Sequence, residues 1–315
     1  MNLLEASDVF LLHNEYERRL SSKTIRAYRT DLRQFSEFIQ IHPALNNVQA
    51  ISKEILRDYL QKILAVQKPK TARRKAATLR AFLNFLEYED HIQSNPFRKL
   101  KIQIKEGRLL PRTIPHREVT KLLAHVHKKK GFAAPHSKNR KQLIRDIAVI
   151  EMLFASGLRV SEVSGLQKGN VDLHRGTIQA LGKGNRERTI PVCCDAVLHL
   201  LQNYAAEFGI FENDKPWFFV NRNGKRLSEQ SIRFMIRRRV QEASIDRHIT
   251  PHMFRHTVAT QLLRNGMDIR NIQHLLGHSS ILTTQIYTHI DNQTHRRDLR
   301  RHHPRGRLQF PSDEG

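Results

Sequence analysis

The sequence predicts a mainly α-helical protein of two units, with a small β-hairpin in the second unit. Three observations support this fold class. Apolar residues recur at helical spacing through most of the chain. Residues 96–112 combine two prolines, a glycine and several basic residues, a composition typical of a linker. Two short runs of strand composition, at residues 177–181 and 188–192, flank the turn sequence GKGN.

The first unit, residues 1–95, reads as helices joined by short turns. One helix is predicted to begin at a Ser21/Ser22 cap, because serine oxygens accept hydrogen bonds from the free N–H groups of a first turn. A second helix is predicted near residues 70–92. The apolar faces of these two helices comprise Ile25, Tyr28, Leu32, Phe35, Phe38 and Ile39 in the first, and Leu79, Phe82, Leu83 and Leu86 in the second.

Both helices also carry basic residues. A single basic stripe is most often a solvated helix face. The chain, however, has 54 Lys plus Arg against 30 Asp plus Glu, a formal net charge of +24, and this imbalance indicates a polyanionic partner. Charge alone favours DNA and RNA equally. The candidate contacts to nucleic acid are Arg26, Arg29, Arg73, Arg74, Lys75 and Arg80.

Other features bound the location of the protein. No run of 18 apolar residues is present, so we expect no membrane-spanning helix, and the N-terminal residues lack the pattern of a signal peptide. The two cysteines, Cys193 and Cys194, are adjacent and unsuited to a disulfide framework. A reducing, cytoplasmic location fits these features best.

The second unit, residues 113–315, is predicted to be mostly helical around the hairpin. The polar, basic segment at residues 125–142 reads as a mobile loop between helices. The pattern becomes helical again from Leu198, interrupted by a turn-bearing segment at residues 217–225.

Two motifs in this unit place cations where they can meet a phosphate. Arg159 and Glu162 lie three residues apart and so share a helix face, where the carboxylate can orient the guanidinium; the alternative is a surface ion pair. Lys183 stands between Gly182 and Gly184 at the hairpin tip, where it can approach a phosphate backbone or donate a proton to a leaving oxygen. The alternative is a solvated turn lysine.

The sequence HMFRH brings His252, Arg255 and His256 together. Histidines four residues apart on a helix can bind zinc, but the intervening glutamate base of zinc hydrolases is absent and no third ligand is evident. Pro251 places His252 at a helix N-terminus, which favours an anion. We therefore favour phosphate over metal here, and a packing role for His256.

Two further residues complete the set. His278 follows a glycine that can close a helix, and Tyr287 comes nine residues later. A lone tyrosine at helical spacing is usually a packing residue. The case for Tyr287 therefore depends on the two arginines, which can clamp one phosphodiester while a tyrosine attacks the phosphorus.

Taken together, these motifs resemble the tyrosine recombinase (phage integrase) family, most of all its Xer-type members. The resemblance covers nearly the whole chain and implies a SAM-like N-terminal DNA-binding domain plus a catalytic domain of the DNA breaking–rejoining enzyme fold. The family pattern is Arg, hairpin Lys, His-x-x-Arg, His and Tyr. Its positions here are Arg159, Lys183, His252, Arg255, His278 and Tyr287.

The resemblance implies a mechanism without ATP, metal or other cofactor. Arg159, Arg255 and His278 would hold the scissile phosphate, Glu162 would support Arg159, and Tyr287 would form a 3′-phosphotyrosyl bond. His252 would assist the tyrosine's proton transfer, and Lys183 would protonate the 5′-oxygen. Two rounds of exchange would pass through a Holliday junction.

The partners implied are double-stranded DNA carrying a specific site, and three further protomers in a homotetramer or heterotetramer. The tail is similar to the Xer-type ending, in which a helix docks into a neighbouring protomer; prolines limit such a helix to roughly residues 290–303. Two alternatives within DNA biology are type IB topoisomerase-like relaxation and a catalytically silent architectural protein.

Overall fold

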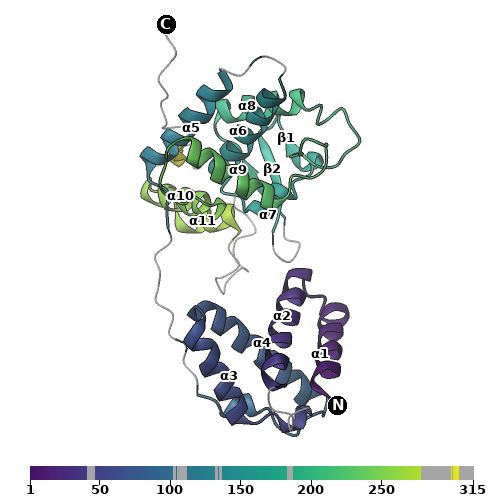
Figure 1. Ribbon diagram of the computed structural model, residues 1–315. Helices are drawn as coiled ribbons and strands as arrows, with labels where there is room; N and C mark the ends of the chain where they lie inside the picture. The colour runs from purple at the N-terminus through teal and green to yellow at the C-terminus, as the bar shows by residue number, and fades with distance from the viewer. Residues whose placement is uncertain are drawn as a thin grey trace. The chain divides into compact units, whose positions relative to one another are not determined.

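The computed structural model describes residues 1–40, 47–101, 104, 112–131, 134, 137–182, 187–277, 299 and 301–304. The chain divides into two compact units, Met1–Leu109 and Leu110–Gly315 (Figure 1). Both consist mainly of helices, as the sequence predicts, and the small sheet belongs to the second. Among the described residues, no helix is both long and apolar enough to cross a membrane.

In the N-terminal unit, each helix start has a local cause. Ser21 accepts a hydrogen bond from the Thr24 N–H and so begins α2, as predicted, while Pro69 occupies the first turn of α4. The residues of the predicted apolar faces of α2 and α4 are buried or half-buried, and all of them except Ile25 belong to one core. The helices are α1 (Leu3–Leu12), α2 (Ser22–Ile39), α3 (Lys53–Val66) and α4 (Pro69–Tyr88).

The N-terminal core extends into the segment predicted as a linker. A short 3₁₀ turn, Pro96–Lys99, follows α4, and Phe97 and Leu100 are buried among the core residues of this unit. The guanidinium of Arg80 on α4 also lies 4.9 Å from the centre of the Phe97 ring. The first residues after 95 therefore pack as part of the N-terminal unit.

The second unit has a helical core beside a three-stranded antiparallel sheet of order β1-β2-β3. Strands β2 and β3 form the predicted hairpin, with Ile178 opposite Ile190 and Ala180 opposite Arg188. The strands are β1 (Val171–Asp172), β2 (Thr177–Leu181) and β3 (Glu187–Pro191). The helices are α5 (His116–Gly131), α6 (Lys138–Ser156), α7 (Val160–Ser164), α8 (Asp195–Glu207), α9 (Glu229–Glu242), α10 (Pro251–Arg264) and α11 (Ile269–Leu276).

The predicted loop at residues 125–142 is largely wrong. Helix α5 continues to Gly131, and α6 begins at Lys138, where Ser137 accepts a hydrogen bond from the Arg140 N–H. Lysines in the last turn of α5 suit its partially negative C-terminal end, so a basic run that appears loop-like extends the helix.

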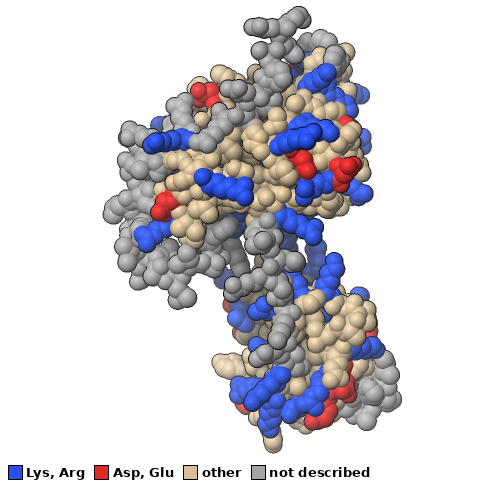
Figure 2. All heavy atoms as spheres, turned by 90° about the vertical axis from the view of Figure 1, so that its left-hand side faces the viewer, with Lys and Arg blue, Asp and Glu red and all other residues tan. Residues whose placement is uncertain are grey.

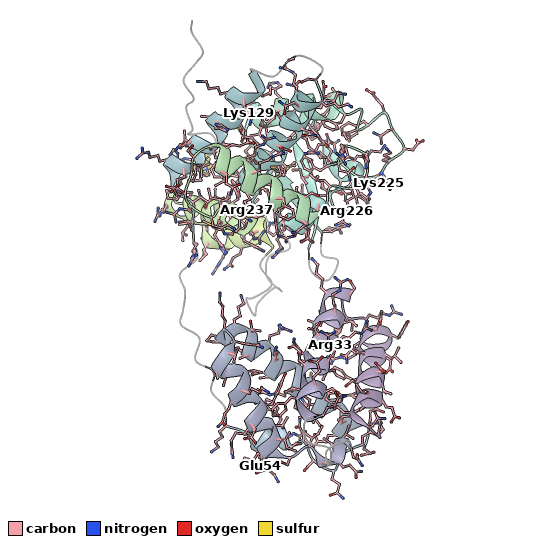
Figure 3. All side chains as sticks on the ribbon, viewed as in Figure 1. Arg33, Glu54, Lys129, Lys225, Arg226 and Arg237 are labelled. Atoms are coloured by element: carbon pink, nitrogen blue, oxygen red, sulfur yellow. The ribbon has the colours of Figure 1, made fainter. Side chains whose placement is uncertain are left out.

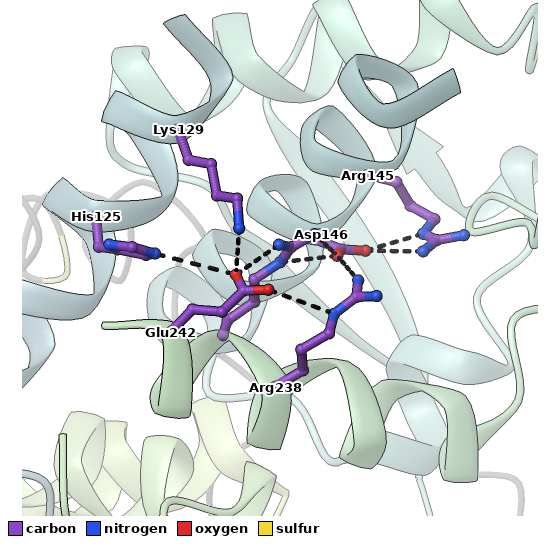
Figure 4. Close-up of polar contacts among 7 residues, drawn as sticks. His125, Lys129, Arg145, Asp146, Arg238 and Glu242 are labelled. Atoms are coloured by element: carbon purple, nitrogen blue, oxygen red, sulfur yellow. Dashed lines mark hydrogen bonds and ion pairs between the residues drawn. The ribbon is translucent and has the colours of Figure 1, made fainter. Parts of the chain in front are cut away.

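Helices α5, α6 and α9 are joined by a network of charged side chains (Figure 4). Asp146 of α6 is fully buried and its carboxylate accepts hydrogen bonds from Arg145, Arg238 and Arg239, the last at 2.6 and 3.0 Å. Glu242 pairs with Arg239 at 2.8 Å and with Lys129 at 3.0 Å. Because Arg239 is itself buried, its positive charge must be compensated, and these two carboxylates compensate it.

We expect Asp146→Ala to lower the free energy of unfolding of the second unit by about 3–5 kcal/mol, because it leaves Arg239 buried without its main partner. Lys129→Ala, which removes a side chain that is 38% exposed, should cost less than about 1 kcal/mol. Urea unfolding followed by fluorescence of Trp217, the only tryptophan, reports on this unit alone. Equal losses in the two variants would contradict the prediction.

The described residues of the C-terminal tail pack on the second unit of the same chain. Leu299 is fully buried in its core, and His303 lies edge-on to the ring of Phe154. The side-chain amide of Asn265 donates to the carbonyl of His302 at 2.6 Å. This contact is intramolecular; docking of the tail into a neighbouring protomer stays a prediction about the assembly on DNA.

Candidate active site

Arg159 is placed by the short helix α7, which starts immediately after it. Glu162, one turn on, accepts a hydrogen bond from the Arg159 backbone N–H at 2.8 Å and from its guanidinium at 2.9 Å. The backbone bond closes the first turn of α7, as an acidic residue at this position commonly does. The Arg159 side chain is 30% exposed, so it is held yet still accessible to a ligand.

Three arginines converge on the C-terminal end of α11. Arg188 donates to the carbonyl of Leu275 at 2.9 Å, Arg255 to that of Leu276, and Arg159 to that of Gly277 at 3.0 Å. The last carbonyls of a helix have no partner within the helix and carry partial negative charge. Three consecutive carbonyls are thus satisfied by cations from β3, from α10 and from the residue that immediately precedes α7.

Two glycines allow this convergence. Gly157 ends α6 and Gly277 ends α11, both in the left-handed region with φ of 62° and 64°. A Cβ on Gly157 would lie 2.7 Å from a methyl group of Leu276, and one on Gly277 would lie 3.1–3.2 Å from the Arg188 side chain. The carbonyl of Gly157 also accepts from Arg255 at 2.9 Å.

Glu162 lies between Arg159 and Arg188, with its side chain only 5% exposed. Arg188 donates to both carboxylate oxygens, at 2.9 and 3.0 Å. Burial alone would raise the pKa of the Glu162 carboxyl, but hydrogen bonds from Arg188 and from the Arg159 backbone outweigh it and lower the pKa below its ordinary value. The carboxylate is therefore charged at neutral pH.

Arg255, in the second turn of α10, is 4% exposed. Burial, followed by repulsion from Arg159, lowers the pKa of its guanidinium to about 10, while Glu162 acts in the opposite direction. The group still carries its charge at neutral pH. A buried cation next to a second cation is a site with a strong preference for an anion.

His252 stands at the start of α10, directly after Pro251. Burial and the nearby charges of Arg233, Arg255 and Arg159 lower its pKa, so the imidazole is neutral at pH 7. The pKa of His256 is also lowered, by burial first and then by His252. Within the described ranges, no three His, Cys, Asp or Glu side chains gather as a metal site would require.

The structure thus brings together three of the predicted site residues, Arg159, Glu162 and Arg255. His252 is near enough for the charges of both arginines to lower its pKa. Lys183, His278 and Tyr287 lie outside the described residues. A separate cavity of about 520 Å³, lined by α6, α9 and residues 221–223, includes none of the site residues.

Comparison with known proteins identifies the family. The model of the phage integrase family matches residues 112–294, and that of the phage integrase N-terminal SAM-like domain matches residues 8–90. The chain belongs to the phage integrase family. A tyrosine recombinase of Agathobacter rectalis is 42% identical over 294 residues, covering 93% of this chain and 94% of that protein.

Xer recombinases are similar over nearly the full length. Tyrosine recombinase XerD of Halalkalibacterium halodurans is 35% identical over 301 residues, covering 94% of this chain and 96% of that protein. Among solved structures, the XerH recombinase bound to its difH substrate has a TM-score of 0.66 at 24% identity, covering 88% of this chain and 78% of that chain, and so supports the fold. The predicted family and fold class are confirmed: the chain is an Xer-like tyrosine recombinase.

The N-terminal unit of the recombinase presents most of its predicted DNA contacts to solvent. Arg26 and Arg29 on α2 are exposed, and Arg33 lies on the same helix (Figure 3). Figure 2 shows Lys and Arg side chains outnumbering Asp and Glu on the drawn face of this unit. On α4, the exposed members of the predicted set are Arg73, Arg74 and Arg80.

Lys75 differs from the other members of this set. It is only 4% exposed, and burial, partly offset by Asp31, lowers the pKa of its ammonium group. Arg74, beside it, pairs with Asp31 across α2 and α4 while its side chain stays 46% exposed. Lys75 is therefore placed among packing residues rather than on the exposed basic surface.

Sequence reasoning missed Arg188. The signal was present, because Arg188 and Ile190 share the inward face of β3 while Glu187 and Thr189 point outward. An arginine at a core-facing strand position needs a buried partner. The partner, Glu162, is 26 residues away in sequence, and only the tertiary structure reveals it.

Proposed function

We propose that this recombinase exchanges DNA strands at a specific site through a 3′-phosphotyrosyl intermediate and a Holliday junction. The observation that supports this most directly is the position of Arg159 and Arg255, anchored side by side on the end of α11. Each guanidinium gives some donors to carbonyl oxygens and retains others for a ligand. Two fixed cations of this kind suit the two non-bridging oxygens of one phosphodiester.

The remaining roles follow from the chemistry of transesterification. The Tyr287 oxygen bonds to phosphorus as the bond to the 5′-oxygen breaks, and His278 adds a hydrogen bond to the phosphate. His252, neutral at pH 7, accepts the tyrosine's proton, and Lys183 donates one to the departing 5′-oxygen. The phosphotyrosyl ester retains the energy of the broken bond, so the reverse attack by another 5′-hydroxyl needs no ATP.

The proposed partner is double-stranded DNA, gripped partly by Arg26, Arg29, Arg73, Arg74 and Arg80 of the N-terminal unit. Strand exchange between two sites requires four active protomers, as a homotetramer or a heterotetramer with a second recombinase. Such an enzyme acts on the DNA of the bacterial nucleoid, in the cytoplasm.

Covalent trapping tests this function. The protein is incubated with fragmented host DNA carrying nicks that release the short cleaved product, with EDTA present, and SDS-resistant adducts are sequenced. Adducts on one recurring, partly palindromic sequence are the expected result. Adducts spread over all sequences would favour topoisomerase-like relaxation. Tight binding without adducts, even after a second recombinase is added, would favour an architectural role.

The lowered pKa of His252 predicts how cleavage depends on pH. A base must be neutral to accept a proton, and a lowered pKa keeps it neutral to lower pH. We therefore expect the second-order rate constant for cleavage to hold steady from pH ~8 down to ~6.5 and to fall only below the ordinary histidine pKa. The constant is measured at subsaturating DNA, where it reports on the free enzyme.

Substitution tests whether His252 causes this fall of the rate constant at low pH, the acid limb of the pH profile. His252→Gln should cleave about 10²-fold more slowly and lose the limb, whereas the matched variant His256→Gln should keep it. An acid limb that persists unchanged in His252→Gln would assign it to another group.

A further inference from the structure

Arg188 occupies an unusual place for a charged residue. It projects inward from β3, the strand that follows Lys183 in the sequence, and its side chain is 6% exposed. Desolvating a guanidinium to this degree is costly unless its donors are satisfied. The groups that accept its hydrogen bonds therefore indicate its role.

All three nitrogens of Arg188 donate to protein groups. The two terminal nitrogens bind the two oxygens of Glu162 in a forked arrangement, and Nε binds the Leu275 carbonyl. These bonds join β3, α7 and the end of α11. Because its side chain is also almost fully buried, Arg188 acts on other residues of the site rather than on the phosphate itself.

The bonds to Glu162 have a consequence for Arg159. The Oε1 atom of Glu162 accepts from both Arg159 and Arg188, each at 2.9 Å. Without Arg188, the buried carboxylate would have Arg159 as its only arginine partner among the described residues. It would then draw both terminal nitrogens of Arg159 toward itself and compete with a phosphate for the same donors.

We propose that Arg188 is a positioning residue of strand exchange: by sharing Glu162 with Arg159, it leaves Arg159 donors available to the scissile phosphate, and through Leu275 it locks the hairpin strand against α11. This inference rests on the proposed function. It makes a specific prediction, because the harm done by losing Arg188 comes largely from the carboxylate left behind. Removing that charge as well should restore activity.

The test compares Arg188→Met, Glu162→Gln and the double variant in single-turnover cleavage of the trapped DNA site at saturating protein. Arg188→Met should cleave about 10²-fold more slowly, with DNA affinity within about 3-fold of wild type, since misdirected catalytic groups cost rate rather than binding. The double variant should cleave at least about 10-fold faster than Arg188→Met. A double variant that is as slow as Arg188→Met, or slower, would overturn the proposal.

Two further variants separate positioning from stability. Arg226→Met removes another arginine that binds α7, through the carbonyl of Ser164 at 3.0 Å, near the start of α9 (Figure 3). This variant should cleave at the wild-type rate. A rate as low as that of Arg188→Met would show that losing any contact to α7 slows cleavage, and would contradict a specific role for Arg188. Arg188→Lys keeps the charge without the fork, and we expect an intermediate rate. If Arg188→Met does not fold, this variant carries the comparison with Glu162→Gln.

A measurement without catalysis distinguishes failure of this proposal from failure of the proposed function. Binding of inorganic phosphate to the DNA-free protein is followed by thermal shift. Arg188→Met should weaken it, and the added Glu162→Gln should restore it. Wild-type protein that forms no adducts even with a second recombinase present would refute the proposed function. The phosphate titration would still decide the role of Arg188, because equal affinities in all variants would refute that role.

Discussion

Tyr287→Phe should abolish covalent attachment to DNA while leaving binding intact. The substitution removes one oxygen, the proposed nucleophile, and phenylalanine has no atom that can form the phosphotyrosyl bond. We expect SDS-resistant adducts to fall by at least about 10⁴-fold, because loss of a covalent nucleophile is among the largest single effects in enzymes. Gel-shift affinity for the same DNA should change by less than about 2-fold, since one hydroxyl contributes little to a phosphate-dominated interface.

Tyr88→Phe is the matched control. It deletes the same atom from a side chain that is 81% exposed at the end of α4, and it should form adducts at the wild-type level. Adducts that persist in Tyr287→Phe would show that another residue attacks the phosphorus, and peptide mapping of the adduct would identify it.

Arg255→Lys should lower single-turnover cleavage about 10²–10³-fold although it conserves charge. Arg255 bridges the carbonyls of Gly157 and Leu276 with two different nitrogens and is almost fully buried. A lysine has one nitrogen and cannot span both carbonyls and a phosphate. One buried carbonyl loses its partner, so we also expect unfolding to become easier by about 1–3 kcal/mol.

Arg264→Lys provides the comparison on the same helix. Arg264 lies exposed in the last turn of α10, and its replacement should leave both cleavage and stability within error of wild type. Full cleavage by Arg255→Lys would show that a point charge suffices at this position and that the fork is dispensable.

The hairpin and the basic segment at residues 125–142 show where pattern reasoning works. Residues 177–181 were identifiable as a strand because alternating burial leaves an alternating sequence, and the structure has β2 at the same residues. The polar composition of the basic segment favours a loop and hides its helical content. Within this segment the lysines suit the C-terminal end of α5, and the Ser137 cap starts α6. These local effects outweigh the absence of an apolar stripe in the segment.

The sequence identifies the six predicted site residues in order, because each residue type has its own chemistry and each lies in a recognisable local motif. They are Arg159, Lys183, His252, Arg255, His278 and Tyr287. From that order the sequence by itself determined the family and led to the proposed reaction, while the helical spacing of its apolar residues determined the mainly helical fold. It could not determine what holds these groups. The three arginines are anchored by carbonyls at residues 275–277, and the carboxylate between them is shared with a strand 26 residues away. Backbone carbonyls are chemically alike at every position, so only the tertiary structure decides which of them a buried guanidinium binds.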